Sequence, residues 1–250
     1  MKRLQNIFDR SKALIIFDVC GVDDSEERLE TIINSGADIV ELGIPFSDPV
    51  ADGTVIQEAA QRALASGANL ERILNTTRRI RQRHPETGLI IFGYYNIFLQ
   101  FGLEKLFARL AELEIDGILI VDLPYEEQPE VEEFTSRYNV SLIQLIGPAT
   151  DLKRAEMLTK KAEGFVYCIN AKGVTGVRSE MPTELVERLE ALRKVSPVPV
   201  ASGFGIADGE TCRQLASHAD GVIVGSAAVK LPLAKLGDFI SGLKNALKQV

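Results

Sequence analysis

Eight short apolar runs alternate with longer amphipathic stretches along almost the whole chain, and this alternation restricts the possible folds more than any other feature. Most runs are rich in Ile and Val without polar alternation, which is typical of parallel strands buried on both faces. The predicted strands are Ala13–Val19, Ala37–Leu42, Leu89–Phe92, Gly117–Val121, Val140–Ile146, Gly164–Ile169, Val198–Ala201 and Gly221–Val224.

Residues at helical spacing occupy the stretches between these runs. The predicted helices are Glu26–Asn34, Leu70–Gln82, Glu104–Leu113, Glu130–Arg137, Leu152–Lys161, Pro182–Val195, Gly209–Ser217 and Leu236–Lys248. Eight strands, each followed by a helix, in a chain of 250 residues predict an α/β fold with one (β/α)8 TIM barrel domain over residues 1–250. A doubly wound open sheet is the rival, but it usually has fewer strands.

Charge and composition exclude several classes of function. The formal net charge is −7, and no basic stripe is present, so the sequence lacks the electrostatic footprint of a nucleic-acid-binding protein. No apolar stretch is long enough to span a membrane, and the first residues do not resemble a secretory signal. The three cysteines lie far apart and show no metal-binding spacing, which indicates a reducing, cytoplasmic protein without a metal site.

Acidic residues occur at and after the end of the second predicted strand. Glu41 lies within the end of the run, and Asp48 and Asp52 lie in the segment that follows. Barrel active sites form at the carboxyl ends of strands, and a carboxyl group buried there has a raised pKa that suits a general acid and base. A charge among Ile, Val and Leu also needs a reason, so we interpret Glu41 as functional. Asp48 is interpreted as a turn residue, and Asp52 fits a turn or a site equally well.

Glycine-bearing loops follow the last three predicted strands. They read Asn170-Ala-Lys-Gly-Val-Thr-Gly176, Ser202-Gly-Phe-Gly-Ile206 and Gly225-Ser226, the last opening a short apolar segment. One such glycine indicates only a turn, but the set is typical of a barrel phosphate site, where backbone N–H groups approach the oxygens. Aromatic residues at or near strand ends, such as Tyr94 and Tyr167, could enclose a flat apolar ring, although core packing is the better explanation for any single tyrosine.

Together these motifs resemble the alpha subunit family of tryptophan synthase. They occur in the family's order along nearly the whole chain, and the first is long and highly specific. The matching stretches are Glu41-Leu-Gly-Ile-Pro-Phe-Ser-Asp-Pro-Val-Ala-Asp-Gly53, Tyr94-Tyr-Asn-Ile-Phe98, Asp122-Leu-Pro-Tyr-Glu-Glu127, Gly173-Val-Thr-Gly176, Gly203-Phe-Gly-Ile206 and Ala219-Asp-Gly-Val-Ile-Val-Gly-Ser226.

The resemblance implies a lyase that cleaves indole-3-glycerol phosphate to indole and glyceraldehyde 3-phosphate by a retro-aldol reaction. It implies no metal and no organic cofactor in this subunit. Glu41 is similar to the family's acid–base residue, Asp52 to the acceptor of the indole N–H, and Tyr167 to a residue beside the catalytic glutamate. The implied substrate-binding residues are Tyr94, Thr175, Gly176, Phe204, Gly205, Gly225 and Ser226.

A partner also follows from the resemblance. The family works as an αββα complex in which a PLP-dependent beta subunit receives indole through a tunnel and joins it to serine. The loop Pro45–Asp52 and the region near Asn96 would face that beta subunit, and the loop carrying Gly173–Gly176 would close over the substrate.

Two segments depart from the family's pattern. The usual Pro-x-x-Thr-Ala-Gly-x-Pro after the first strand is absent from the segment containing Phe17–Gly21, and the usual Ser-Arg before Gly-Val-Thr-Gly is replaced within Asn170–Lys172. Three alternatives stay open: a stand-alone lyase that releases free indole, a phosphate-binding subunit that activates a partner without catalysis, and another phosphate-binding barrel such as a sugar-phosphate isomerase.

Overall fold

Nine parallel strands form one barrel-shaped sheet in the computed structural model, which describes residues 2–22, 24–169, 181–203 and 205–250. Their order around the sheet is β5-β4-β3-β2-β1-β9-β8-β7-β6. The strands are β1 (Ala13–Val19), β2 (Ile39–Gly43), β3 (Gly88–Gly93), β4 (Gly117–Ile120), β5 (Ser141–Leu142), β6 (Gln144–Ile146), β7 (Val166–Ile169), β8 (Val200–Gly203) and β9 (Gly221–Val224).

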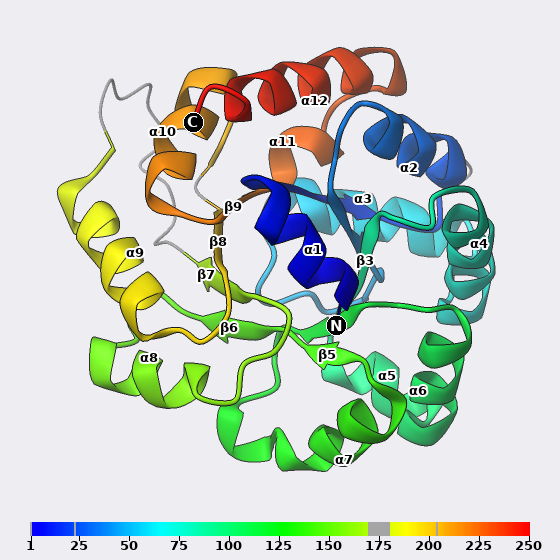
Figure 1. The fold of residues 1–250 in the computed structure, drawn as a ribbon. Coiled ribbons are helices and arrows are strands. Elements are labelled where there is room, and N and C mark those ends of the chain that lie inside the picture. The colour runs from blue at the N-terminus through cyan, green and yellow to red at the C-terminus, as the bar shows by residue number, and fades with distance from the viewer. Residues whose placement is uncertain (1, 23, 170–180, 204) are drawn as a thin grey trace.

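Helices surround the sheet on its outer side, which confirms the predicted TIM barrel (Figure 1). Among the described helices, none is both long and apolar enough to cross a bilayer. Besides the 3-10 turn Tyr125–Glu127, they are α1 (Lys2–Arg10), α2 (Ser25–Asn34), α3 (Thr54–Ala65), α4 (Leu70–Arg83), α5 (Tyr95–Phe101), α6 (Leu103–Glu112), α7 (Pro129–Tyr138), α8 (Leu152–Thr159), α9 (Thr183–Val195), α10 (Gly209–His218), α11 (Ser226–Val229) and α12 (Leu233–Leu247).

The fifth predicted strand, Val140–Ile146, is wrong as one continuous strand. Its first part, β5, pairs with β4, whereas its second part, β6, pairs with β7, and Ile143 lies between them. The chain changes its pairing partner there, and this change closes the barrel. The predicted starts of two later strands are also too early, because Gly164 has a φ of +66° and Pro199 has no N–H to donate.

Helices α1, α3 and α5 were not predicted. The buried face of α3 consists of Ala59, Ala60 and Ala63, whose small side chains give a weak apolar pattern. Helix α1 lies across the amino-terminal end of the barrel, at the centre of Figure 1. Its Leu4 and Ile7 belong to the apolar cluster inside the barrel, so α1 closes that end and leaves the carboxyl end of the strands for a site.

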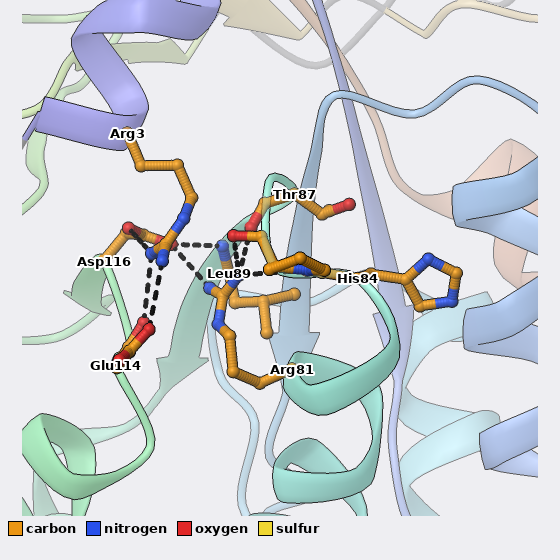
Figure 2. Close-up of polar contacts among 8 residues, drawn as sticks. Arg3, Arg81, His84, Thr87, Leu89, Glu114 and Asp116 are labelled. Carbon is orange, nitrogen blue, oxygen red and sulfur yellow. Dashed lines mark hydrogen bonds and ion pairs between the residues drawn. The ribbon is translucent and has the colours of Figure 1, made fainter.

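Asp116, just before β4, is the centre of a polar network at this closed end (Figure 2). Its Oδ1 accepts a hydrogen bond from Arg3 of α1. Its Oδ2 accepts bonds from Arg81 Nη2 at 2.8 Å and from the Leu89 backbone N–H at 2.9 Å. Arg81 also donates to three backbone carbonyls of the loop between α4 and β3. The network therefore connects α1, α4, β3 and the start of β4.

Two further aspartates repeat this arrangement. Asp38 Oδ2 accepts the Leu14 N–H at 2.7 Å, and Asp220 Oδ2 accepts the Val200 N–H at 2.9 Å. Each of these carboxylates also pairs with a cation from a surrounding helix. The amino-terminal end of the barrel thus uses aspartates to bond the backbone at the start of the neighbouring strand.

Candidate active site

Glu41 lies inside the barrel near the carboxyl end of β2. Side chains alternate along a strand, so Glu41 faces the same side as Ile39, which packs in the barrel interior. Phe17 of β1 is its partner in the strand register. Glu41 is 0% exposed, and within the described part of the chain neither carboxyl oxygen has a hydrogen-bond partner.

Burial determines the protonation state of Glu41. Removal from water raises its pKa from 4.5 to about 8, because the charged form loses its hydration. The carboxyl group therefore carries its proton at neutral pH. A protonated carboxyl in an apolar interior can donate that proton to a substrate and later take one back, as a general acid and base does.

Tyr167 of β7 lies in the same part of the barrel. Burial raises the pKa of its hydroxyl, and the nearby carboxyl groups of Glu41 and Asp52 raise it further. An added Cβ at Gly203 of β8 would lie 3.3 Å from Tyr167 Oη, so the tyrosine hydroxyl lies over this glycine. The structure thus brings three of the predicted site residues, Glu41, Asp52 and Tyr167, to one end of the barrel.

Asp52 is held by the loop between β2 and α3 and by Tyr94. The backbone N–H of Asp52 bonds to the Pro49 carbonyl at 3.0 Å, and the Gln57 side chain donates to the Asp52 carbonyl at 2.9 Å. Tyr94 Oη donates a 3.0 Å hydrogen bond to Asp52 Oδ2. Burial raises the pKa of Asp52, whereas this hydrogen bond lowers it by favouring the charged form.

Aromatic rings form the walls of a cleft beside Asp52. Phe46 stacks on Tyr94 with ring centroids 5.0 Å apart, and Phe17 meets Phe92 edge-on at 4.9 Å. These four rings and Asp52 line the cleft. The three phenylalanines were not predicted as site residues, although Phe92 ends a predicted strand and Phe17 lies near the end of another, which could have suggested both. Aromatic side chains beside one carboxylate have the chemistry to contact a flat apolar ring with one polar N–H.

The predicted phosphate loops are described only in part. Gly205 follows β8 with a φ of +46°, a left-handed conformation that favours glycine. Gly225 follows β9 and directly precedes α11, which begins at Ser226. The predicted residues Thr175, Gly176 and Phe204, with the segment Asn170–Lys172, lie outside the described residues.

Groups of His, Cys, Asp and Glu suited to a metal ion were searched for in residues 2–22, 24–169, 181–203 and 205–250, and none occurs there. Cys20, Cys168 and Cys212 are buried and form no disulfide with one another. The buried carboxyl group of Glu41 and the aromatic cleft beside Asp52 together offer proton transfer next to an apolar binding surface.

Comparisons with known proteins agree with this geometry. The sequence profile of the tryptophan synthase alpha chain family matches residues 6–248. The chain is 42% identical over 247 residues to the tryptophan synthase alpha chain of Geobacter sulfurreducens, which covers 94% of this chain and 93% of that one. It is 42% identical over 235 residues to the tryptophan synthase alpha chain of Halalkalibacterium halodurans, covering 92% of this chain and 88% of that one.

Solved structures give the same result. The crystal structure of tryptophan synthase subunit alpha from Legionella pneumophila has a TM-score of 0.90 and 32% identity, and the match covers 100% of this chain and 98% of that one. A structure of Mycobacterium tuberculosis tryptophan synthase has a TM-score of 0.89 and 30% identity, with 98% of each chain covered. From its fold, the arrangement of its site and these similarities, the chain belongs to the tryptophan synthase alpha chain family.

Proposed function

We propose that this chain cleaves indole-3-glycerol phosphate to indole and glyceraldehyde 3-phosphate, as the alpha subunit of a tryptophan synthase. The observation that carries the proposal is the fully buried carboxyl group of Glu41 close to an aromatic cleft, where burial raises its pKa to about 8. The reaction breaks the bond between indole C3 and the hydroxyl-bearing carbon of the glycerol chain. It needs a proton delivered to C3 and a proton removed from that hydroxyl.

Glu41 performs both proton transfers. It protonates indole C3, which places positive charge on the ring, and its carboxylate then takes the proton from the glycerol 3′-hydroxyl. The O–H electrons become the aldehyde C=O, and the electrons of the broken C–C bond return to the ring. Asp52 accepts the indole N–H and stabilises the positive charge in between. The Tyr94 hydrogen bond supports this role because it favours the charged form of Asp52.

The remaining site residues bind the substrate. Tyr94 lines the indole cleft, and Tyr167 and Thr175 contribute to binding the glycerol part of the substrate. Backbone N–H groups of Gly176, Gly205, Gly225 and Ser226 bind the phosphate, and Phe204 contributes to the same site. Proton transfer and hydrogen bonding suffice for this reaction, so we infer that the subunit works without a metal or organic cofactor.

We infer that the chain works in the cytoplasm in an αββα complex with a beta subunit whose PLP joins indole to serine. The surface that contacts the beta subunit comprises two adjacent segments, the loop Pro45–Asp52 and the region near Asn96 in α5. Val50 in the first is 86% exposed, and Leu99 in the second is 51% exposed. Large apolar side chains exposed on neighbouring segments are typical of a protein interface.

Indole release from indole-3-glycerol phosphate tests the proposal, first with the pure protein and then with a tryptophan synthase beta subunit added. We expect slow release that rises sharply with the partner. Fast release without stimulation would indicate a stand-alone lyase. Tight substrate binding without release in either tube would instead indicate a binding subunit that has lost catalysis.

A further inference from the structure

A buried ion pair joins β1 to α2 next to the proposed phosphate loop. Asp18 lies on the outer face of β1, where its neighbours Leu14 and Ile16 are fully buried beneath the helices, and Asp18 itself is 3% exposed. Arg28 of α2 binds it with two hydrogen bonds, Nε to Oδ2 at 2.7 Å and Nη2 to Oδ1 at 3.1 Å. A buried pair of this kind is often no more stabilising than apolar side chains of similar size, so its presence calls for a further role.

Arg28 has two more hydrogen bonds, and both lead to the carboxyl end of α11. Its Nη1 donates to the Leu231 carbonyl at 2.9 Å, and its Nη2 donates to the Ala228 carbonyl at 3.2 Å. These two acceptors lie about 200 residues away in the sequence, as the separations of 203 and 200 show. The planar guanidinium group therefore connects Asp18 with the end of α11 in a fixed geometry.

Helix α11 is short enough for its two ends to move together. It is one turn long, and the Gly225 carbonyl accepts the N–H groups of Ala228 at 2.9 Å and Val229 at 3.1 Å. Four residues of α-helix span only about 6 Å, so a shift at the Ala228 carbonyl also displaces Gly225 and Ser226. The proposed phosphate contacts thus lie one helical turn from the Arg28 hydrogen bonds.

We propose that Asp18 and Arg28 are positioning residues for phosphate binding. Asp18 orients the Arg28 guanidinium, Arg28 fixes the carboxyl end of α11, and α11 holds Gly225 and Ser226 where the substrate phosphate binds. This inference rests on the proposed function, because it uses the same phosphate site. It also gives a physical role to part of the segment Phe17–Gly21, which departs from the family's usual sequence.

The test uses the reverse reaction, in which indole and glyceraldehyde 3-phosphate condense, because only one of the two substrates carries a phosphate. In Arg28→Lys the amine keeps the charge pairing with Asp18 but lacks the fork that reaches both carbonyls. We expect the KM for glyceraldehyde 3-phosphate to rise about fivefold or more, as for loss of one or two hydrogen bonds. The KM for indole and kcat should stay within about twofold of the wild type.

Arg81→Lys is the matched control. Arg81 and Asp116 form another buried pair, with side-chain exposures of 7% and 3% against 8% and 4% for Arg28 and Asp18, but at the opposite end of the barrel. We expect it to lower stability without changing either KM. The double variant Asp18→Val, Arg28→Met replaces the pair by apolar side chains and should show the same selective rise in KM with the fold retained.

Binding of glycerol 3-phosphate, measured by calorimetry, gives a readout that needs no catalysis. Weaker binding by both Arg28 variants than by the wild type and by Arg81→Lys supports the positioning role, even if the wild type proves not to be a lyase. Equal affinity in all four proteins overturns it while leaving the proposed function intact. A parallel rise in both KM values also overturns it, since a general loss of structure would act on indole and phosphate alike.

Discussion

The hydroxyl of Tyr94 forms a bridge between its own strand end and Asp52, 42 residues earlier in the chain. It donates to Asp52 Oδ2 at 3.0 Å and accepts the backbone N–H of Ala51 at 3.1 Å. Both bonds fix the same short stretch of the loop after β2. The orientation of the Asp52 carboxylate therefore depends on a residue at the start of α5.

Tyr94→Phe should separate orientation from ring packing. The variant keeps the ring stacked on Phe46 but loses the bridge, so we expect kcat for cleavage to fall about tenfold, as for loss of a hydrogen bond to a charged group. The control is Tyr95→Phe, because the Tyr95 hydroxyl bonds to Glu130 on the surface and not to Asp52. Steady-state kinetics on the two variants would contradict this role if their kcat values fell equally.

Glu41→Gln should remove catalysis and preserve the fold. The amide has the same shape but cannot exchange a proton, and general acid–base catalysis contributes about 100- to 10,000-fold to rate. We expect indole release to fall within that range and the circular dichroism spectrum to remain that of the wild type. Full activity in the folded variant would exclude Glu41 as the acid–base residue.

The pH dependence of cleavage should follow the protonation of Glu41. Burial raises its pKa to about 8, and the first step needs the protonated form. We therefore expect kcat/KM to be nearly level around neutral pH and to fall as pH rises through about 8. A profile that rises through this range would mean that the free enzyme needs the carboxylate at the outset.

The same shift predicts how stability changes with pH. The native state holds the Glu41 proton more tightly than the unfolded chain, whose pKa is near 4.5. The contribution of Glu41 to the free energy of unfolding is therefore largest below pH 4.5 and is lost as pH rises to about 8. Glu41→Gln has no ionisable group at this position and therefore does not lose this contribution. In urea unfolding, the free energy of unfolding of the variant should rise relative to that of the wild type as pH increases from 4.5 to about 8. A constant difference would mean that Glu41 ionises normally in the native state.

Asp116→Asn should act on stability alone. Asp116 pairs with Arg81 and Arg3 and accepts the Leu89 N–H at the closed end of the barrel. Breaking a buried ion pair leaves a charge without its partner, so we expect a loss of about 3 kcal/mol in urea unfolding. The kcat of the folded variant should equal that of the wild type. A fall in kcat under conditions where the variant is fully folded would contradict this separation.

Sequence patterns over a few consecutive residues were enough to predict where the strands lie. The apolar runs located every strand of the barrel, and two of them, Ala13–Val19 and Gly221–Val224, match the observed strands from end to end. Alternation and chain order also placed Glu41 near the carboxyl end of a strand. The split of the fifth strand was not predictable in this way, because it depends on which neighbour each half pairs with.

The missed contacts join residues far apart in the sequence. Tyr94 reaches Asp52 only because two loops meet at one end of the barrel, and Arg28 reaches Leu231 across 203 residues. The aspartates Asp38 and Asp116 do have a local signal, since each directly precedes a strand. Their partners, however, are the starts of other strands, and no spacing in the sequence specifies them.

The pairing of β1 with β9 has a consequence for synthesis of the chain. Ala13 lies opposite Gly221 in this pairing, so β1 can complete its backbone hydrogen bonds only after β9 has been synthesised. Until residues 221–224 have left the ribosome, one edge of β1 has no native neighbour. An unpaired, Ile-rich edge is prone to associate with other chains. Cells that make this protein must therefore keep an open, almost complete sheet from aggregating, and a truncation that removes β9 would leave that edge of β1 permanently unpaired.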